Sequence, residues 1–224
     1  MPYRRTDNVI RRLAARQQAI LAAARSAATE GGMAAVQVAP VAQRAGIATG
    51  TVYRYFPSKN DLVTALVSAI AEREIGALRK AGKAAPGPLS ALAASIATFA
   101  ARAMRNRKLA WAVIAEPVDA EVEAVRIAYR RALAEELQTR IQAAMQAGYL
   151  PAQDTSLAAP ALVGALLEGL IGPLAPGPNN DPARAREAVQ TLTLLSLRAL
   201  GVIDARARGL VVQIALPTLE EGAA

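Results

Sequence analysis

The segment from residue 37 to residue 62, QVAPVAQRAGIATGTVYRYFPSKNDL, constrains the fold more than any other part of the chain. A short helical pattern runs from Val38 to Ala45 and stops at Gly46, and a second begins near Thr49 and ends before Pro57. Glycine accepts the positive φ of a tight turn, and proline does not continue a helix. The segment therefore predicts two short helices joined by a tight turn, which is a helix-turn-helix.

Positive charge is concentrated around this motif. The formal net charge is +8, and residues 1–60 hold nine Lys or Arg residues against two acidic ones, which leaves +7 in that segment. A basic stretch alone is compatible with a solvated surface that aids solubility. Because the second helix of a helix-turn-helix is the one that enters a DNA major groove, the coincidence of charge and motif favours double-stranded DNA as the partner.

The composition predicts an all-α protein. Hydrophobic residues make up 53% of the 224 residues, whereas aromatic residues make up 4%. Alanine and leucine are abundant, and few windows alternate between apolar and polar residues with a period of two. We therefore expect a helical protein with a substantial core.

The chain contains no cysteine and no histidine. This excludes disulfides, thiolate or histidine metal sites and catalytic triads that need either residue, so we expect no cofactor, no metal and no catalytic residue. The acid pairs Glu121/Glu123 and Glu135/Glu136 are one and two residues apart, a spacing that does not share a helical face. We expect a protein that is not an enzyme. The first 30 residues lack a continuous apolar stretch of a secretory signal, which predicts a cytoplasmic location.

Amphipathic helices are expected along the rest of the chain. A first helix has its apolar side at Val9, Leu13, Ile20, Ala24 and Ala28 and ends at the two glycines 31 and 32. Another begins after the N-cap candidate Ser58, with Asp61 three residues later, and ends near Ala81 before a loop at residues 82–88. Further helices are expected at about 89–104, 108–115, 120–147, 155–172 and 183–200, and residues 204–216 are ambiguous between helix and strand. In the 120–147 helix, the Glu136–Arg140 pair is expected to lie away from the apolar stripe.

The segment from residue 155 to residue 172 is very apolar and has two interpretations. A transmembrane helix would need a longer uninterrupted apolar run, and this one contains Pro160, three glycines and Glu168. A helix buried between subunits, with 183–200 as its companion in a four-helix interface, fits better and predicts a homodimer. The alternative is a membrane-surface helical protein that uses the basic N-terminus and residues 156–175.

Several short stretches occur in the order and spacing of a known family. The chain resembles the TetR family of transcriptional regulators, the tetracycline-repressor-like helix-turn-helix proteins, over about a fifth of its length. The residues that carry the resemblance are Ile20–Ala24, Gly31-Gly32, Val41–Ile47, Thr51–Phe56 and Ser58–Leu62.

The resemblance implies a homodimeric regulator, with a helix-turn-helix domain at residues 1–60 and a helical ligand-binding and dimerisation domain at 61–224. It further implies a repressor that a small, largely apolar effector releases from a palindromic operator. The family usually has a Ser or Thr cap before the first short helix, but this chain has Gln37 there, followed by Val38, Ala39 and Pro40.

The second short helix carries the candidate DNA-binding residues. Ile47, Val52 and Phe56 are expected to face the core, which leaves the intervening side chains for DNA. Backbone N–H groups and hydroxyls at the start of the helix suit phosphate, and the Arg54 guanidinium matches the guanine O6/N7 edge. The resemblance assigns backbone contacts to the residues matching Thr51, Tyr53, Tyr55 and Lys59. The complete set is Thr49, Gly50, Thr51, Tyr53, Arg54, Tyr55 and Lys59, and Arg4, Arg5, Arg11 and Arg12 either form a DNA-tracking arm or are disordered.

An apolar effector pocket is expected among the helices between residues 89 and 172. Trp111 is the only tryptophan of the chain, and Glu116 and Glu168 are carboxylates in apolar stretches, where a buried charge needs a partner. For each residue the alternative is ordinary core packing, or for the acids a pairing across the dimer. The candidates are Phe99, Met104, Trp111, Glu116, Tyr129, Met145 and Glu168.

The proposed base contact of Arg54 can be tested by substitution. Replacing Arg54 with Ala is expected to relax the preference at one base position and to cost about 1–3 kcal/mol of specific binding, because a bidentate contact to one base is lost. Binding of an operator and of its single-base variants measures this. A uniform loss across all sequences would make Arg54 a phosphate contact instead.

Overall fold

The computed structural model describes residues 7–176 and 181–214, and within these ranges every regular element is a helix. The predicted all-α fold is therefore confirmed. The elements are α1 (Asp7–Gly31), the short 3₁₀ helix η1 (Met33–Ala35), α2 (Val38–Arg44), α3 (Thr49–Tyr55), α4 (Lys59–Ala84), α5 (Pro88–Arg105), α6 (Arg107–Ile114), α7 (Ala120–Gln146), α8 (Thr155–Leu170), α9 (Pro182–Ala199) and α10 (Asp204–Gln213).

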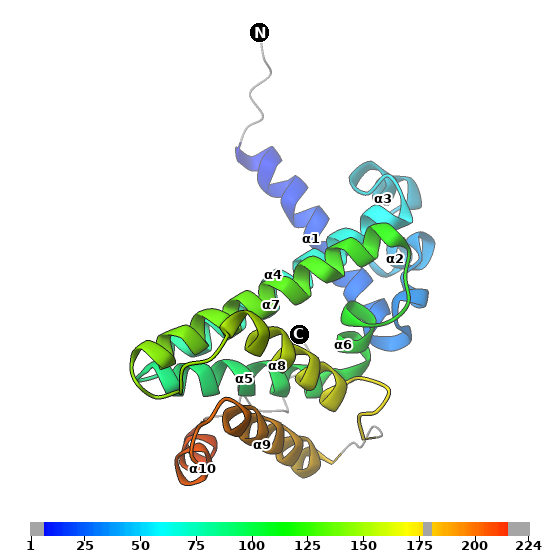
Figure 1. Ribbon diagram of the computed structural model, residues 1–224. Coiled ribbons are helices and arrows are strands. Elements are labelled where there is room, and N and C mark those ends of the chain that lie inside the picture. Colours follow the sequence, from blue (N-terminus) through cyan, green and yellow to red (C-terminus); the bar gives the residue numbers. More distant parts are fainter. Residues whose placement is uncertain (1–6, 177–180, 215–224) are drawn as a thin grey trace.

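The predicted helix-turn-helix is present as α2 and α3, which pack on each other while α2 also packs on α1 (Figure 1). Gly46 has a φ of 64° in the turn between them. The Gly46 N–H donates to the Gln43 carbonyl at 3.1 Å, and the Ile47 N–H donates to the Ala42 carbonyl at 3.0 Å. These two bonds form a Schellman motif, which requires the positive φ that glycine supplies at least cost.

Burial fixes the orientation of α3 around its own axis. Val52 is fully buried and Phe56 is 3% exposed, and both belong to the main hydrophobic cluster of the molecule, together with Ile20 and Ala24 of α1. Ile47 is only half-buried but packs against the same cluster. The expectation that these residues face the core is confirmed.

Helix α4 begins at a complete capping box and runs for 26 residues. The Ser58 hydroxyl accepts from the Asp61 N–H at 3.0 Å, and the Asp61 carboxylate accepts from the Ser58 N–H at 3.0 Å. This confirms the start predicted from the sequence. The helix ends at Ala84 rather than near Ala81, because Gly82 is tolerated in its last turn, where it is buried beside Arg140 and Ser95.

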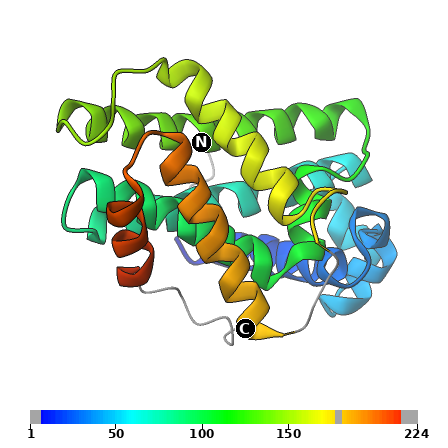
Figure 2. The ribbon, with the colours of Figure 1, turned by 60° about the horizontal axis from the view of Figure 1, so that its bottom comes forward.

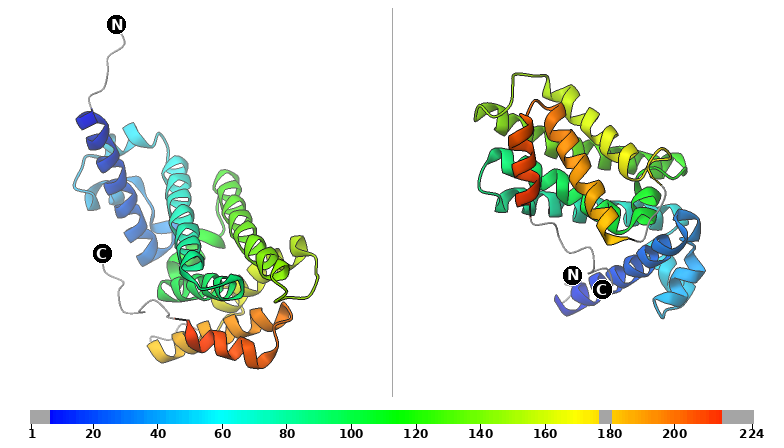
Figure 3. Two further views of the ribbon diagram at one scale, coloured as in Figure 1. Left: turned by 90° about the vertical axis from the view of Figure 1, so that its left-hand side faces the viewer. Right: turned by 90° about the horizontal axis from the view of Figure 1, so that it is seen from below.

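The larger part of the molecule is a bundle around α5, which packs on α4, α7, α8 and α9. Twelve of its 18 residues are buried, so α5 forms the centre of this part. Helices α8 and α9 cover one side of the bundle, and α10 packs on α9 (Figure 2). They lie at the opposite end of the molecule from α2 and α3 (Figure 3).

Two sequence expectations need correction, and one alternative that the sequence left open is decided. Val9 is 37% exposed and Ile10 is 52% exposed, because the first turns of α1 extend beyond the body of the molecule (Figure 1). Residues 204–213 of the ambiguous segment form a helix, α10, while 215–224 lie outside the described residues. Glu136 pairs with Arg140 at 2.8 Å as expected, but it is 7% exposed instead of lying on the outer face. It is kept there by a second partner, Arg79 of α4, at 3.0 Å.

The capping box at the start of α4 is expected to contribute measurable stability. Replacing Ser58 with Ala should lower the free energy of unfolding by about 0.5–2 kcal/mol, because an N-terminal N–H of α4 loses its acceptor. Urea denaturation measures this, with Ser68→Ala on the same helix as a matched control that should not destabilise the protein. An equal loss in both variants would contradict the role of the cap.

Candidate nucleic-acid interface and effector cavity

The outer side of α3 collects the side chains expected to contact DNA. Thr49, Gly50 and Arg54 are exposed, and Tyr53 is 48% exposed. Thr51 and Tyr55 are half-buried, and Tyr55 packs against the core cluster. Lys59 is exposed in the first turn of α4. All seven predicted residues therefore keep at least part of their surface available, with Tyr53 more open than Tyr55.

No side chain caps the start of α2 or of α3. The N-cap of α2 is Gln37, whose side-chain amide donates to the Ala34 carbonyl at 2.9 Å instead of capping. The N-cap of α3 is Ala48. The Thr51 N–H donates to the Ala48 carbonyl at 2.8 Å, but the first N–H groups of a helix have no partner within it. A phosphate at this end of α3 would find donors of matching polarity.

Among the basic residues of the N-terminal part, Arg44 forms an ion pair within the protein, whereas others are exposed on the surface. Arg44 binds Glu30 of α1, with Nη2 to Oε2 at 2.7 Å, and its Nη1 donates to the Ser26 hydroxyl at 2.7 Å. This bonding holds the pKa of Glu30 below its usual value and fastens the end of α2 to α1. Arg12 and Arg16 are exposed on α1, whereas Arg4 and Arg5 lie outside the described residues.

Polar contacts join the helix-turn-helix part to the bundle at the end of α1. Glu116, which follows α6, accepts from the Met33 N–H at 2.9 Å. The Lys108 ammonium donates to the Glu30 carbonyl at 2.6 Å, and the Asn106 amide donates to the Thr29 hydroxyl at 3.1 Å. Gly32 has a φ of 73°, and a Cβ there would lie 2.7 Å from a Glu116 carboxylate oxygen. Glycine at 32 therefore permits both the turn and the close approach of Glu116.

Arg126 supports Glu116 from inside the molecule, a role that was not predicted from the sequence. This side chain is 1% exposed and donates to the carbonyls of Ala112 and Glu116. Burial lowers the pKa of its guanidinium. Glu123, three residues earlier on α7, lies 3.6 Å from the Arg126 guanidinium, but the two backbone carbonyls that this guanidinium binds outside α7 give no sequence signal.

The residues predicted for an effector pocket lie in different surroundings. Phe99 and Tyr129 are buried, and burial raises the pKa of the Tyr129 phenol well above its usual value. Trp111 and Met145 are half-buried. Glu116 binds the Met33 N–H, and the exposed Glu168 accepts from the Leu174 N–H at 3.0 Å. None of these six residues lines the cavity that contains Met104.

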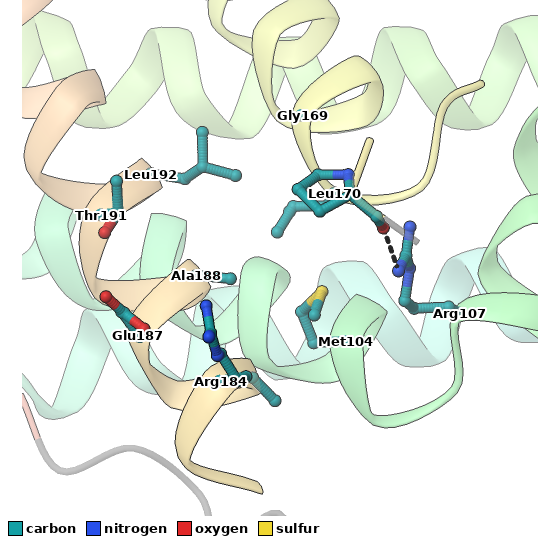
Figure 4. A pocket seen from close by; sticks show the side chains of 11 residues that line it. Met104, Arg107, Gly169, Leu170, Arg184, Glu187, Ala188, Thr191 and Leu192 are labelled. Atoms are coloured by element: carbon teal, nitrogen blue, oxygen red, sulfur yellow. Dashed lines mark hydrogen bonds between the residues drawn. The ribbon is translucent and has the colours of Figure 1, made fainter. Parts of the chain in front are cut away.

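Met104, the seventh predicted pocket residue, lines a cavity of about 410 Å³ between α9, the end of α8 and the corner where α5 meets α6 (Figure 4). Its volume is in the range of small-molecule pockets, roughly 300–1,000 Å³. Arg107 lies on one side, and Arg184, Glu187 and Thr191 project from α9 on the other. The remaining lining residues are Gly169, Leu170, Pro176, Ala185, Ala188 and Leu192.

The helices predicted for dimerisation each bury one face and expose another. On α8, Leu162, Leu166 and Leu170 are buried, whereas Leu157 is 70% exposed beside exposed small residues at Ala161, Gly164 and Ala165. On α9, Val189 and Leu197 are buried and Leu195 is 53% exposed. An apolar outer face such as that of α8 is typical of protein–protein interfaces, whereas the exposed side of α9 also carries Arg186, Glu187 and Arg198.

The described residues were also compared with the requirements of a membrane-spanning helix and of a metal site. In the ranges 7–176 and 181–214, none of the helices is long and apolar enough to cross a membrane. Within the same ranges, no group of three or more Asp or Glu side chains is arranged to hold a metal ion.

Sequence comparison finds relatives of the N-terminal part. Residues 20–66 match the family of bacterial regulatory proteins named tetR. The HTH-type transcriptional repressor KstR of Rhodococcus jostii (strain RHA1) is 50% identical over 72 residues, which are 32% of this chain and 32% of KstR. The chain thus matches about a third of the length of this curated relative.

Solved structures resemble nearly the whole chain. RolR, determined in complex with resorcinol, has a TM-score of 0.65 at 21% identity, with 94% of this chain and 99% of RolR covered. A TetR-like transcriptional regulator from Rhodococcus sp. RHA1 has a TM-score of 0.60 at 27% identity, with 83% and 95% covered. The order of a helix-turn-helix followed by a helical bundle is therefore shared with these proteins.

The contact between Glu116 and Met33 gives a testable prediction. Glu116→Ala should lower the free energy of unfolding by about 1–3 kcal/mol and accelerate hydrogen exchange at the Met33 amide, because that N–H loses a charged acceptor. Glu116→Gln, which keeps an acceptor oxygen, should have a smaller effect on both. The exposed Glu135→Ala serves as the control. Unchanged exchange at Met33 in Glu116→Ala would contradict the contact.

Proposed function

We propose, from the premise that the chain belongs to the TetR family of bacterial regulatory proteins, that it is a homodimeric transcriptional repressor released from a palindromic operator by a small ligand. The observation that carries this proposal is the surface of α3. Burial of Val52 and Phe56 turns the polar and basic side chains of α3 outward, and the same residues fall within the 20–66 family match.

We assign DNA contacts by the chemistry and exposure of each residue. Thr49, Gly50 and Thr51 offer N–H groups and hydroxyls to phosphate at the uncapped start of α3. Tyr53 and Tyr55 offer hydroxyls to the DNA backbone, with Tyr53 the more accessible, and Lys59 provides a phosphate contact from α4. Arg54, exposed on the outer side of α3, is the candidate for direct base contact.

Dimerisation is proposed through the outer faces of α8 and α9. The exposed small residues of α8 would let a partner helix approach closely, and Leu157 and Leu195 would lose their exposure to water. Two α3 helices related by a two-fold axis would then read half-sites about 34–36 Å apart, or a multiple of that spacing.

We propose that the first 60 residues act as the DNA-binding unit and the remainder as the ligand-binding and dimerisation unit. The boundary falls in the first turn of α4, a continuous helix that packs on α1, α5 and α7. A rigid helix shared by both units supports the idea that effector binding to the bundle changes the placement of α3. RolR, which shares the fold, was determined with resorcinol, and this supports a small-molecule effector.

The rival interpretations have less support. TetR family regulators are transcription factors rather than enzymes, and membership favours DNA over a membrane surface as the partner of the basic N-terminal part. The apolar 156–175 segment also uses Leu162, Leu166 and Leu170 within the core of the bundle. A cytoplasmic location is part of the same proposal.

Gel-shift titration against the intergenic DNA upstream of the protein's own gene tests DNA binding. Binding should prefer that DNA over a scrambled duplex and weaken steeply with salt, because phosphate contacts release counterions. Lys59→Met should reduce the slope of log K against log salt by about one. Lys80→Met, at an exposed position near the other end of α4, should not. Binding that lacks sequence preference and salt dependence would refute the proposal.

A further inference from the structure

The cavity between α9, the end of α8 and the α5–α6 corner has an uneven distribution of charge (Figure 4). Most of its lining is apolar, including Met104, Leu170, Ala188 and Leu192. The charged lining residues are two arginines, Arg107 and Arg184, and one acid, Glu187. Glu187 lies beside Arg184 on α9, across the cavity from Arg107. The lining on the Arg107 side is otherwise apolar and includes Met104 and Leu170.

Arg107 has hydrogen-bonding capacity that the described residues, 7–176 and 181–214, do not use up. It is half-buried at the first position of α6, and its Nη1 donates to the Pro176 carbonyl at 2.7 Å. No carboxylate of the described part of the chain pairs with it. A guanidinium has five N–H donors in a planar fork that fits a carboxylate or a phosphate, and such charge-assisted bonds strengthen where water is excluded. A partly desolvated arginine at an apolar wall therefore suits an anionic ligand group.

We propose that this cavity binds a small molecule with an apolar body and one anionic group, a carboxylate or a phosphate, held by Arg107. The apolar body would contact Met104, Leu170, Ala188 and Leu192, and Arg184 would add attraction at the α9 side. This inference rests on the proposed function only in treating the occupant as the effector. It names the chemical class of that ligand, which the predicted pocket residues left open.

The position of Arg107 gives an occupied cavity a short path to the helix-turn-helix part. The residues on either side of it, Asn106 and Lys108, make the contacts with Thr29 and Glu30 at the end of α1. A ligand that binds the Arg107 guanidinium would therefore act within one residue of both contacts.

Calorimetric titration of the full chain without DNA tests the ligand class. The probes are decanoate and 2-naphthoate, each paired with its neutral amide, together with decyl phosphate, so that chain, aromatic and phosphate ligands are distinguished. At least one anion should bind about tenfold more tightly than its neutral counterpart, since a single charge-assisted contact is worth that much, about 1.4 kcal/mol.

Substitutions then locate the anionic group. Arg107→Met should abolish the preference for the anion, and Arg107→Lys should retain part of it. Arg186→Met removes the same charge from an exposed α9 position that does not line the cavity, and it should keep the preference. Ala188→Phe, which fills the cavity, should weaken acid and amide alike, with thermal melting confirming that each variant folds.

Three results would overturn the proposal. These are equal affinity for acid and amide in the unchanged protein, an anion preference that survives Arg107→Met, and no binding of any of the three anions at millimolar concentration. Because the titration contains no DNA, each of these results can occur while the gel shift still succeeds. A failed gel shift with intact anion binding would instead refute the DNA proposal alone.

Discussion

A seven-residue helix is too short to be stable in water by itself, so α3 depends on its anchors in the core. Val52 and Phe56 are those anchors, and their burial sets the rotation of α3 about its axis. Since side chains 100° apart on a helix cannot all face inward, burying these two turns Tyr53 and Arg54 to the surface. The Schellman motif at Gly46 then fixes the angle at which α3 leaves α2. The proposed DNA surface is thus a consequence of core packing.

The position of this surface relative to the bundle depends on polar contacts as well as on α4. Lys108 binds a carbonyl at the end of α1, Glu116 binds an N–H of η1 directly after it, and buried Arg126 holds the Glu116 carbonyl in place. Hydrogen bonds are more directional than apolar contacts, so they favour one placement of the two parts. The cavity arginine, Arg107, lies between Asn106 and Lys108, which both make contacts with the end of α1. Because Arg107 and Lys108 are neighbours in the short helix α6, a ligand bound to Arg107 would lie next to these contacts with α1.

Local signals in the sequence were sufficient for most of the helices and for the inner and outer sides of α3, but they left residues 204–216 undecided. Ser58 with Asp61 predicted the start of α4, and Gly46 predicted the turn, because caps and turns depend on residues close together in the chain. The cavity was only partly foreseen, through Met104. Its other lining residues come from α6, α8, the loop after α8 and α9, and nothing in the spacing of Arg107 and Arg184 reveals that they line the same cavity. The burial of Glu136 and Arg126 likewise depends on partners beyond their i,i+3 and i,i+4 neighbours, Arg79 of α4 for Glu136 and two backbone carbonyls for Arg126, which no periodic pattern encodes. Helix periodicity also extended the buried stripe of α1 to Val9, where the structure supplies nothing to bury it.

Hydrogen–deuterium exchange with and without an operator duplex tests the central claim most directly, since it reports on individual backbone segments. On binding, exchange should slow in residues 49–55 and in the first turn of α4, which the proposed contacts cover, while the outer face of α9 is unaffected. Protection confined to the bundle, with α3 unchanged at saturating operator, would contradict the assignment of α3 as the DNA-contacting helix.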